Sequence, residues 1–411
     1  MARRWRYVLP AVLVGGVAVL GWVRSTAGTP PAAPPAAAPA PAEAPPKIAP
    51  AATASAPRAG GPYTPEALAA RRLELAQWQD RLVHAKRTLA SYEASTRYPY
   101  GSRPAAEHLD RWQAHPLIAG DMPLLVPGGA PAPGVRIRTT QQAVFASAND
   151  SVALTVAAVD ADGQPLALRI LRATAHAPQE TTARAKQVDA PNVTQPFVDD
   201  GTQGDAQAAD QVWTTRLVPA AEGFASYAGT IRTELSIQVG DQPGYVAFDV
   251  VYAPDVPATW TGGAHEALED GSLDFILGAQ VAQPGRYVVE GRVDDAAGKP
   301  FAFVSFNEEL GAGVQQVKLT VHGRLVRDTK PAFPLTLHDV TGFLLKPDAF
   351  PDRALMAPRD GIVAVSRKYP LAAFGEATYT SDETARYVAE YGKDVAIAQQ
   401  QVDRLQGGSG P

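Results

Sequence analysis

Apolar and polar residues alternate along the middle of the chain, and this period of two constrains the fold more than any other feature. The run SVALTVAAVDADGQPLALRI begins at Ser151. It predicts a strand from Val152, a turn from Asp160 to Gly163 and a return strand from Leu166 to Ile170. Asp-Gly between alternating apolar runs is a strong hairpin signal. With further strands in TTRLVPA, TELSIQVG and GYVAFDVVYA, residues 135–254 are predicted to form a β-sandwich.

A related hairpin is predicted in RYVVEGRVDDAAGKPFAFVSF, which begins at Arg286. Aligning Val159 with Val293 places Gly163 near Gly298, so the two turns correspond. Residues 255–378 are therefore predicted to form a second sandwich of the same kind. The predicted fold class is mainly β, with two tandem Ig-like β-sandwiches flanked by helices.

A long helix is predicted before the first sandwich. Thr64-Pro65-Glu66 provides a capping hydroxyl, a proline suited to the first turn and an acid near the positive end of the helix dipole. The helix is expected to run to about Tyr92. Its apolar residues recur every seven positions, which is a heptad pattern interrupted only by Arg71. The two series are Leu68, Leu75, Leu82 and Leu89, and Arg71, Trp78, Ala85 and Tyr92.

The rest of the segment 63–134 is predicted to be a proline-rich neck. Five prolines from Pro99 to Pro127 argue against long regular elements there. Because the neck also carries Trp112 and Ile118, we expect it to be ordered and to wrap against the sandwiches.

A second amphipathic helix is predicted within residues 379–411, beginning near Ser381. Its heptad series are Val388, Val395 and Val402, and Tyr391, Ala398 and Leu405. Helices of this length need a partner surface in water. The two helices therefore pack on each other within one chain, on a sandwich, or across a homo-oligomer, and we expect the first arrangement.

The N-terminal segment 1–24 contains an uncharged run from Tyr7 to Val23, preceded by three arginines. Such a run rises about 25 Å as a helix, which is close to the thickness of a bilayer core. The basic flank predicts a cytoplasmic N-terminus and a single span of the inner membrane, with the bulk of the chain periplasmic. The alternative is a signal peptide cleaved after Ser25-Thr26-Ala27, which would release a secreted protein. Residues 25–62 are rich in alanine and proline and predict a semi-rigid spacer.

Composition excludes several classes of function. The chain has no cysteine, which excludes disulfides, thiolate chemistry and a lipoprotein anchor. The net charge of −5 gives no basic face for nucleic acid.

The most distinctive polar segment is the loop 199–210, where Asp199, Asp200, Asp205 and Asp210 are interleaved with glycines. Carboxylate oxygens are the ligands that Ca²⁺ prefers. The spacing differs from that of an EF-hand, and Asp and Gly are also the residues of tight turns. Turn structure is the expected reading, and a calcium site at these four residues is the alternative.

No constellation for catalysis is recognisable in the sequence. The seven histidines include no pair three or four residues apart, and the nearest approach to a serine elbow, around Ser226, has the wrong spacing. We therefore expect no enzyme and no cofactor. A hydrolase would require a serine, a histidine and a carboxylate brought together by the fold.

The run FAFVSFNEELGAGVQQVKLTVHGRLVRD, from Phe301 to Asp328, resembles a pattern of exported bacterial proteins with a choice-of-anchor X domain. In that pattern a hairpin precedes a strand pair, whose positions here are Leu319, Val321, Gly323, Leu325 and Asp328. The acidic loop with Val212-Trp213 after it is similar to a signature of extracellular Ig-like modules. The resemblance implies an Ig-like fold and an extracytoplasmic location, and it carries no catalytic residues.

Together these observations predict a membrane-tethered, extracytoplasmic structural or binding protein, similar to an adhesin, whose partners are the lipid bilayer at residues 7–23 and an envelope protein or glycan. A homo-oligomer through the heptad helices is a further expected association. The competing hypothesis is a calcium-dependent binding module for carbohydrate or protein.

Overall fold

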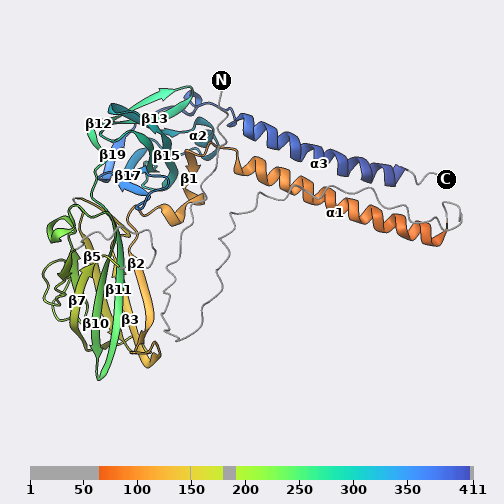
Figure 1. Ribbon diagram of the computed structural model, residues 1–411. Helices are drawn as coiled ribbons and strands as arrows, with labels where there is room; N and C mark the ends of the chain where they lie inside the picture. The colour runs from red at the N-terminus through yellow and green to blue at the C-terminus, as the bar shows by residue number, and fades with distance from the viewer. Residues whose placement is uncertain (1–63, 149, 179–190, 408–411) are drawn as a thin grey trace.

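The computed structural model describes residues 64–148, 150–178 and 191–407. These residues form a mainly β body and a helical arm that projects from one end of it (Figure 1). The body consists of two units, each with two sheets around one core. We call the unit next to the arm the proximal unit and the other the distal unit.

The distal unit contains strands β2 to β11. One sheet has the order β2-β3-β5-β6 with β9 also paired to β5, and the facing sheet has the order β4-β11-β10-β7-β8. The strands are β2 Ile118–Leu125, β3 Pro131–Gln141, β4 Phe145–Ser147, β5 Val152–Val159, β6 Pro165–Leu166, β7 Leu168–His176, β8 Asn192–Thr194, β9 Trp213–Leu217, β10 Gly229–Val239 and β11 Gln242–Ala253. Alternate residues of β10, including Ile231, Leu235 and Ile237, are buried, as the period of two predicts.

The proximal unit contains a three-stranded sheet, β12-β13-β16, and a six-stranded sheet, β1-β15-β14-β17-β18, with β19 paired to β17. The strands are β1 Ser102–Pro104, β12 Ala258–Glu269, β13 Ser272–Val281, β14 Gly285–Asp294, β15 Pro300–Leu310, β16 Gly313–Val321, β17 Thr336–Leu345, β18 Arg353–Leu355 and β19 Arg359–Val365. Short helices complete the body: η1 Ala105–Glu107, η2 Leu109–Arg111, the π-helical turn η3 Ala220–Phe224, α2 Gly323–Thr329 and η4 Leu371–Ala373.

The two predicted hairpin turns have the same hydrogen bonds. The side-chain oxygen Oδ1 of Asp160 accepts from the backbone N–H groups of Asp162 and Gln164, and Asp295 Oδ1 accepts from Ala297 and Lys299 in the same way. The strands on either side of the turns pair differently. Strands β14 and β15 pair along their whole length, whereas only the two residues of β6 pair with β5. The predicted strand through Leu168 and Ile170 is present as β7, but its predicted hairpin pairing is wrong, since β7 crosses to the facing sheet and pairs with β10.

The two units are nested rather than arranged in tandem. Strand β1, which lies in the predicted neck, pairs with β15 of the proximal unit before the chain enters the distal unit. The chain then returns through residues 254–257 to build the remainder of the proximal unit. The expectation that prolines exclude long elements from the neck is also wrong, because β2 is an eight-residue strand that contains Pro123. Pro123 is tolerated in this strand because β2 lies at the edge of its sheet.

The arm is a pair of antiparallel helices, α1 Pro65–Ser95 and α3 Asp382–Gly407. Both predicted caps are present: the hydroxyl of Thr64 accepts from the N–H of Ala67, and that of Ser381 accepts from Thr384. At the body end of the arm Tyr92 packs on Tyr387 and Tyr391. The described ends of the chain, Thr64 and Gly407, lie at the far end of the arm (Figure 1).

The base of the arm is fixed to the body through Asp328 at the end of α2. Its carboxylate accepts a hydrogen bond from Arg97 at 2.7 Å and from the Tyr98 hydroxyl at 2.9 Å, and it also pairs with Arg324. Arg324 also donates to the backbone oxygen of Glu376, which precedes α3. The short helix therefore contacts the segments that lie after α1 and before α3.

The contacts of the Asp328 carboxylate predict that the protein loses stability in acid. The hydrogen bond from Arg97 is the main cause that lowers the pKa of Asp328 from 3.8 to about 2. A carboxyl with a depressed pKa in the folded state contributes stability above its ordinary pKa, and this is lost as the pH falls from about 4 to 2. We expect Asp328→Asn to cost about 1 kcal/mol at pH 7, since the pair is partly solvated, and to cost less in acid. Thermal unfolding of both proteins between pH 2 and 7 measures this; a difference that is independent of pH would contradict it.

No helix within the described ranges has an 18-residue stretch apolar enough to cross a membrane. The predicted anchor at residues 7–23 and the spacer at 25–62 lie outside those ranges.

Candidate functional site

Three of the four predicted metal-ligating aspartates converge in the acidic loop. One carboxylate oxygen from each of Asp199, Asp205 and Asp210 lies within 4.8 Å of the others. The loop leads into β9, and a bridge between Val198 and Thr214 closes its two ends. Asp205 is buried, and its carboxylate accepts from the N–H of Gly201 at 2.7 Å. The fourth residue, Asp200, is outside this group.

The same carboxylates also hold the loop together. The two side-chain oxygens of Asp199 accept from the N–H groups of Asp210 and Gln211 at 3.0 and 3.1 Å. Asp200 binds the N–H and hydroxyl of Thr202. These contacts are the turn structure expected from Asp and Gly. A cation at the loop would gain three of the six to eight oxygens that Ca²⁺ takes, so the residues fit an incomplete calcium site.

Some heptad positions from each arm helix form one seam, whereas Leu68 is exposed. Leu82 of α1 and Ala398 and Val402 of α3 are buried there, with Leu75, Trp78 and Val395 packed beside them. The charged position in the heptad has a structural role at the free end of the arm. The Arg71 guanidinium donates to the backbone oxygen of Leu405 at 2.7 and 3.1 Å, so it caps the end of α3.

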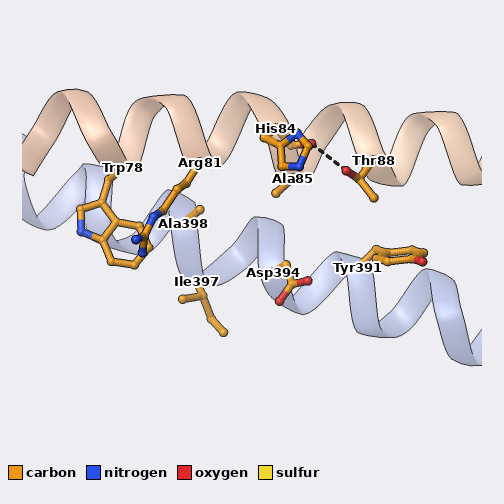
Figure 2. Close-up of a pocket in the computed structure, with 9 residues that line it drawn as sticks. All are labelled: Trp78, Arg81, His84, Ala85, Thr88, Tyr391, Asp394, Ile397 and Ala398. Carbon is orange, nitrogen blue, oxygen red and sulfur yellow. Dashed lines mark hydrogen bonds between the residues drawn. The ribbon is translucent and has the colours of Figure 1, made fainter. Parts of the chain in front are cut away.

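A groove of about 360 Å³ runs along one side of this seam, near the middle of the arm (Figure 2). Small residues, Ala85 and Ala398, form part of its lining, together with Trp78 and Tyr391. Ile397 also lines the groove and is 52% exposed. Arg81 and Asp394 stand on α1 and α3 respectively, and Figure 2 shows no hydrogen bond between them.

A second hollow of about 360 Å³ lies between the two units, where His115 and Asp360 are 2.9 Å apart. Close to it Arg353 of β18 stacks on Phe343 of the proximal unit and on Phe145 of the distal unit, with its guanidinium carbon 4.8 and 4.5 Å from the ring centres. This cation–π contact on two rings joins the units directly.

A cluster of charged side chains in the proximal unit was not predicted from the sequence. His338 lies between two carboxylates, with Nδ1 at 2.8 Å from Asp339 and Nε2 at 3.2 Å from Asp294. Beside it Arg292 is buried, and burial lowers the pKa of its guanidinium. No spacing rule indicates this cluster, because its residues come from strands β14 and β17.

The other histidines are dispersed over the fold. His84 is on α1, and His108 comes directly after η1 and stacks near Phe303. His176 and His265 are on β7 and β12, and His322 precedes α2. Burial lowers the pKa of His108 and of His322. Ser226 lies in an exposed turn after η3.

Searches with the sequence find no matching family model and no matching curated protein. Among solved structures, a DUF4785 family protein from Legionella pneumophila has a TM-score of 0.36 and 11% identity over 56% of this chain and 57% of its own. The adhesin InvE of Yersinia pseudotuberculosis has a TM-score of 0.16 and 13% identity over 53% of this chain and 58% of its own. The match therefore spans little more than half the length of each protein. Similarity this low assigns neither a family nor an activity.

Proposed function

We propose that the protein is a non-enzymatic binding protein of the bacterial cell envelope. In this proposal residues 7–23 tether it to the inner membrane and the body lies in the periplasm. The two units are then Ig-like sandwiches that present binding surfaces to an envelope protein or a glycan. The resemblance of Phe301 to Asp328 to exported Ig-like proteins supports this reading.

The observation that carries the proposal is the position of Thr64. The described chain begins at the free end of the arm, and the β body lies at the opposite end (Figure 1). A tether that precedes residue 64 therefore joins the end remote from both units. The 31 residues of α1 span about 45 Å, and the spacer 25–62 adds up to ~100 Å, so the units stand well away from a bilayer.

Membrane fractionation tests the tether. We expect the full chain, expressed in bacteria, to remain in the membrane pellet after an alkaline carbonate wash, while a variant without residues 1–24 becomes soluble. Mass measurement of the pelleted chain separates an uncleaved anchor from a protein processed after Ala27. Recovery of the intact full chain from the cytosol would refute the proposal.

The second candidate function is calcium-dependent binding of a carbohydrate or protein through the loop 199–210. The convergence of Asp199, Asp205 and Asp210 favours it. This candidate predicts that calcium raises the melting temperature of the full chain and that a chelator reverses the rise. Asp210→Asn should abolish the effect, whereas Asp162→Asn, in a turn outside this loop, should retain it. No heat on calorimetric titration and no chelator-sensitive shift would eliminate this candidate.

A further inference from the structure

The arm buries few side chains for its length. The buried apolar residues of the two arm helices are Leu82, Ala398, Val402 and Leu405, whereas each unit of the body has a core of more than twenty buried residues. Isolated helices are marginal in water, and their stability in proteins comes from packing of an apolar face. A pair of long helices that share one thin seam thus leaves apolar surface for a further partner.

The groove in Figure 2 contains one of the exposed apolar side chains of the arm, Ile397, and lies beside the seam. Alanines at positions 85 and 398 leave a hollow between the helices, and larger apolar side chains, Trp78 and Ile397, line it. Side chains from another pair of helices would fill such a hollow, as in a four-helix bundle.

The charged side chains of the groove favour a second copy of this chain as its occupant. Arg81 stands on the α1 side of the groove and Asp394 on the α3 side. If a second copy is related by a two-fold axis along the arm, α1 of each copy faces α3 of the other. Arg81 then approaches Asp394 of the other copy, and the same contact is made twice. If the axis crosses the arm instead, α1 faces α1 and two Arg81 side chains oppose each other, which is unfavourable.

We propose that a second copy of this chain docks along the groove with its arm parallel, so that four helices form a bundle and both bodies lie at the same end. This arrangement rests on the proposed function in one respect. It places Thr64 of both copies at the same end of the bundle, as two chains tethered to one bilayer require. The groove itself, with its alanines and opposite charges, argues for the dimer independently.

A charge reversal tests the docking. The full chain in detergent micelles is expected to sediment as a two-chain species. Arg81→Glu and Asp394→Arg should each weaken association at least about tenfold, because each places like charges together twice. Combining the two reversals in one chain should restore the dimer. The matched control is Arg87→Glu, which alters an exposed charge of α1 that does not line the groove and should leave association unchanged.

The relative orientation of the two arms can be measured by disulfide cross-linking. The chain contains no cysteine, so a single cysteine can be introduced at a chosen position. Mixed copies that carry either Ala85→Cys or Ile397→Cys should form a disulfide between the two kinds of chain if the arms are parallel. A monomer, as expected if the groove takes a helix of a different protein, would overturn the proposal. So would a dimer insensitive to Arg81→Glu, or one cross-linked only between two copies of Ala85→Cys. A groove-dependent dimer that is absent from the membrane pellet would retain the docking and remove the tether.

Discussion

Gly323→Ala should strongly destabilise the proximal unit. A β-carbon at this position would lie 2.0 Å from the backbone oxygen of Gly271 and 2.7 Å from the backbone nitrogen of Gly375. Both neighbours are main-chain atoms, so no side chain can rotate away. These two groups also form a hydrogen bond with each other, since the N–H of Gly375 donates to the oxygen of Gly271 at 2.9 Å. The substitution must therefore separate three segments that meet at the base of the arm.

We expect a loss of about 3 kcal/mol or more in the free energy of unfolding, at the upper end of what overpacking costs. Thermal unfolding monitored by circular dichroism gives this value. The matched control is Gly263→Ala in β12, where a β-carbon meets nothing within 4 Å. Equal melting temperatures for the two variants would show that the three segments do not approach as closely as described.

Arg292→Met is the second substitution with a large expected effect. The buried guanidinium donates to the backbone oxygen of Arg111 at 2.9 and 3.2 Å and to that of Asp339 at 2.8 Å. It thereby joins the segment after α1 to strand β17. Methionine fills a similar volume but leaves these carbonyl groups without their donor. The two acceptors are partly buried, and an acceptor that loses its partner costs about 1–3 kcal/mol, so we expect a total of about 3 kcal/mol.

Hydrogen exchange distinguishes this cause from a general loss of packing. The amides of residues 105–112 should exchange faster in Arg292→Met, because the segment loses its attachment to the sheet. Arg286→Met, at an exposed position of the same strand that bonds Asn307, should change stability by less than about 1 kcal/mol. Unchanged exchange at residues 105–112 would disprove the role assigned to Arg292.

The features predicted correctly from the sequence are those with local signals. The caps at Thr64 and Ser381, the heptad spacing of the arm helices and the two turns that begin at Asp160 and Asp295 depend on residues within a few positions of one another. Their hydrogen bonds and apolar spacing are set by the period of the element. Asp199, Asp205 and Asp210 lie close together because they belong to one loop, and their binding of calcium stays a prediction.

The features that were missed depend on contacts between distant segments. Strand β1 pairs with β15 across about two hundred residues, and no local pattern sets that register. The family resemblance implied a strand pair that continues through Gly323, Leu325 and Asp328, but the chain leaves the strand after Val321 and forms helix α2. Burial of Leu325 and Val326 and the i,i+4 pair of Arg324 with Asp328 support the helix there. The cluster around His338 likewise exists only once β14 and β17 pair.

Labelling of single cysteines in intact spheroplasts tests the central claim most directly, because the natural chain has none. A cysteine in place of Asp241, at the tip of the β10–β11 hairpin, should react at once with a membrane-impermeant maleimide. A cysteine in place of Ala2, on the predicted cytoplasmic side, should react only after the membrane is permeabilised. Protection of the Asp241→Cys variant in intact spheroplasts would contradict a body held outside the inner membrane.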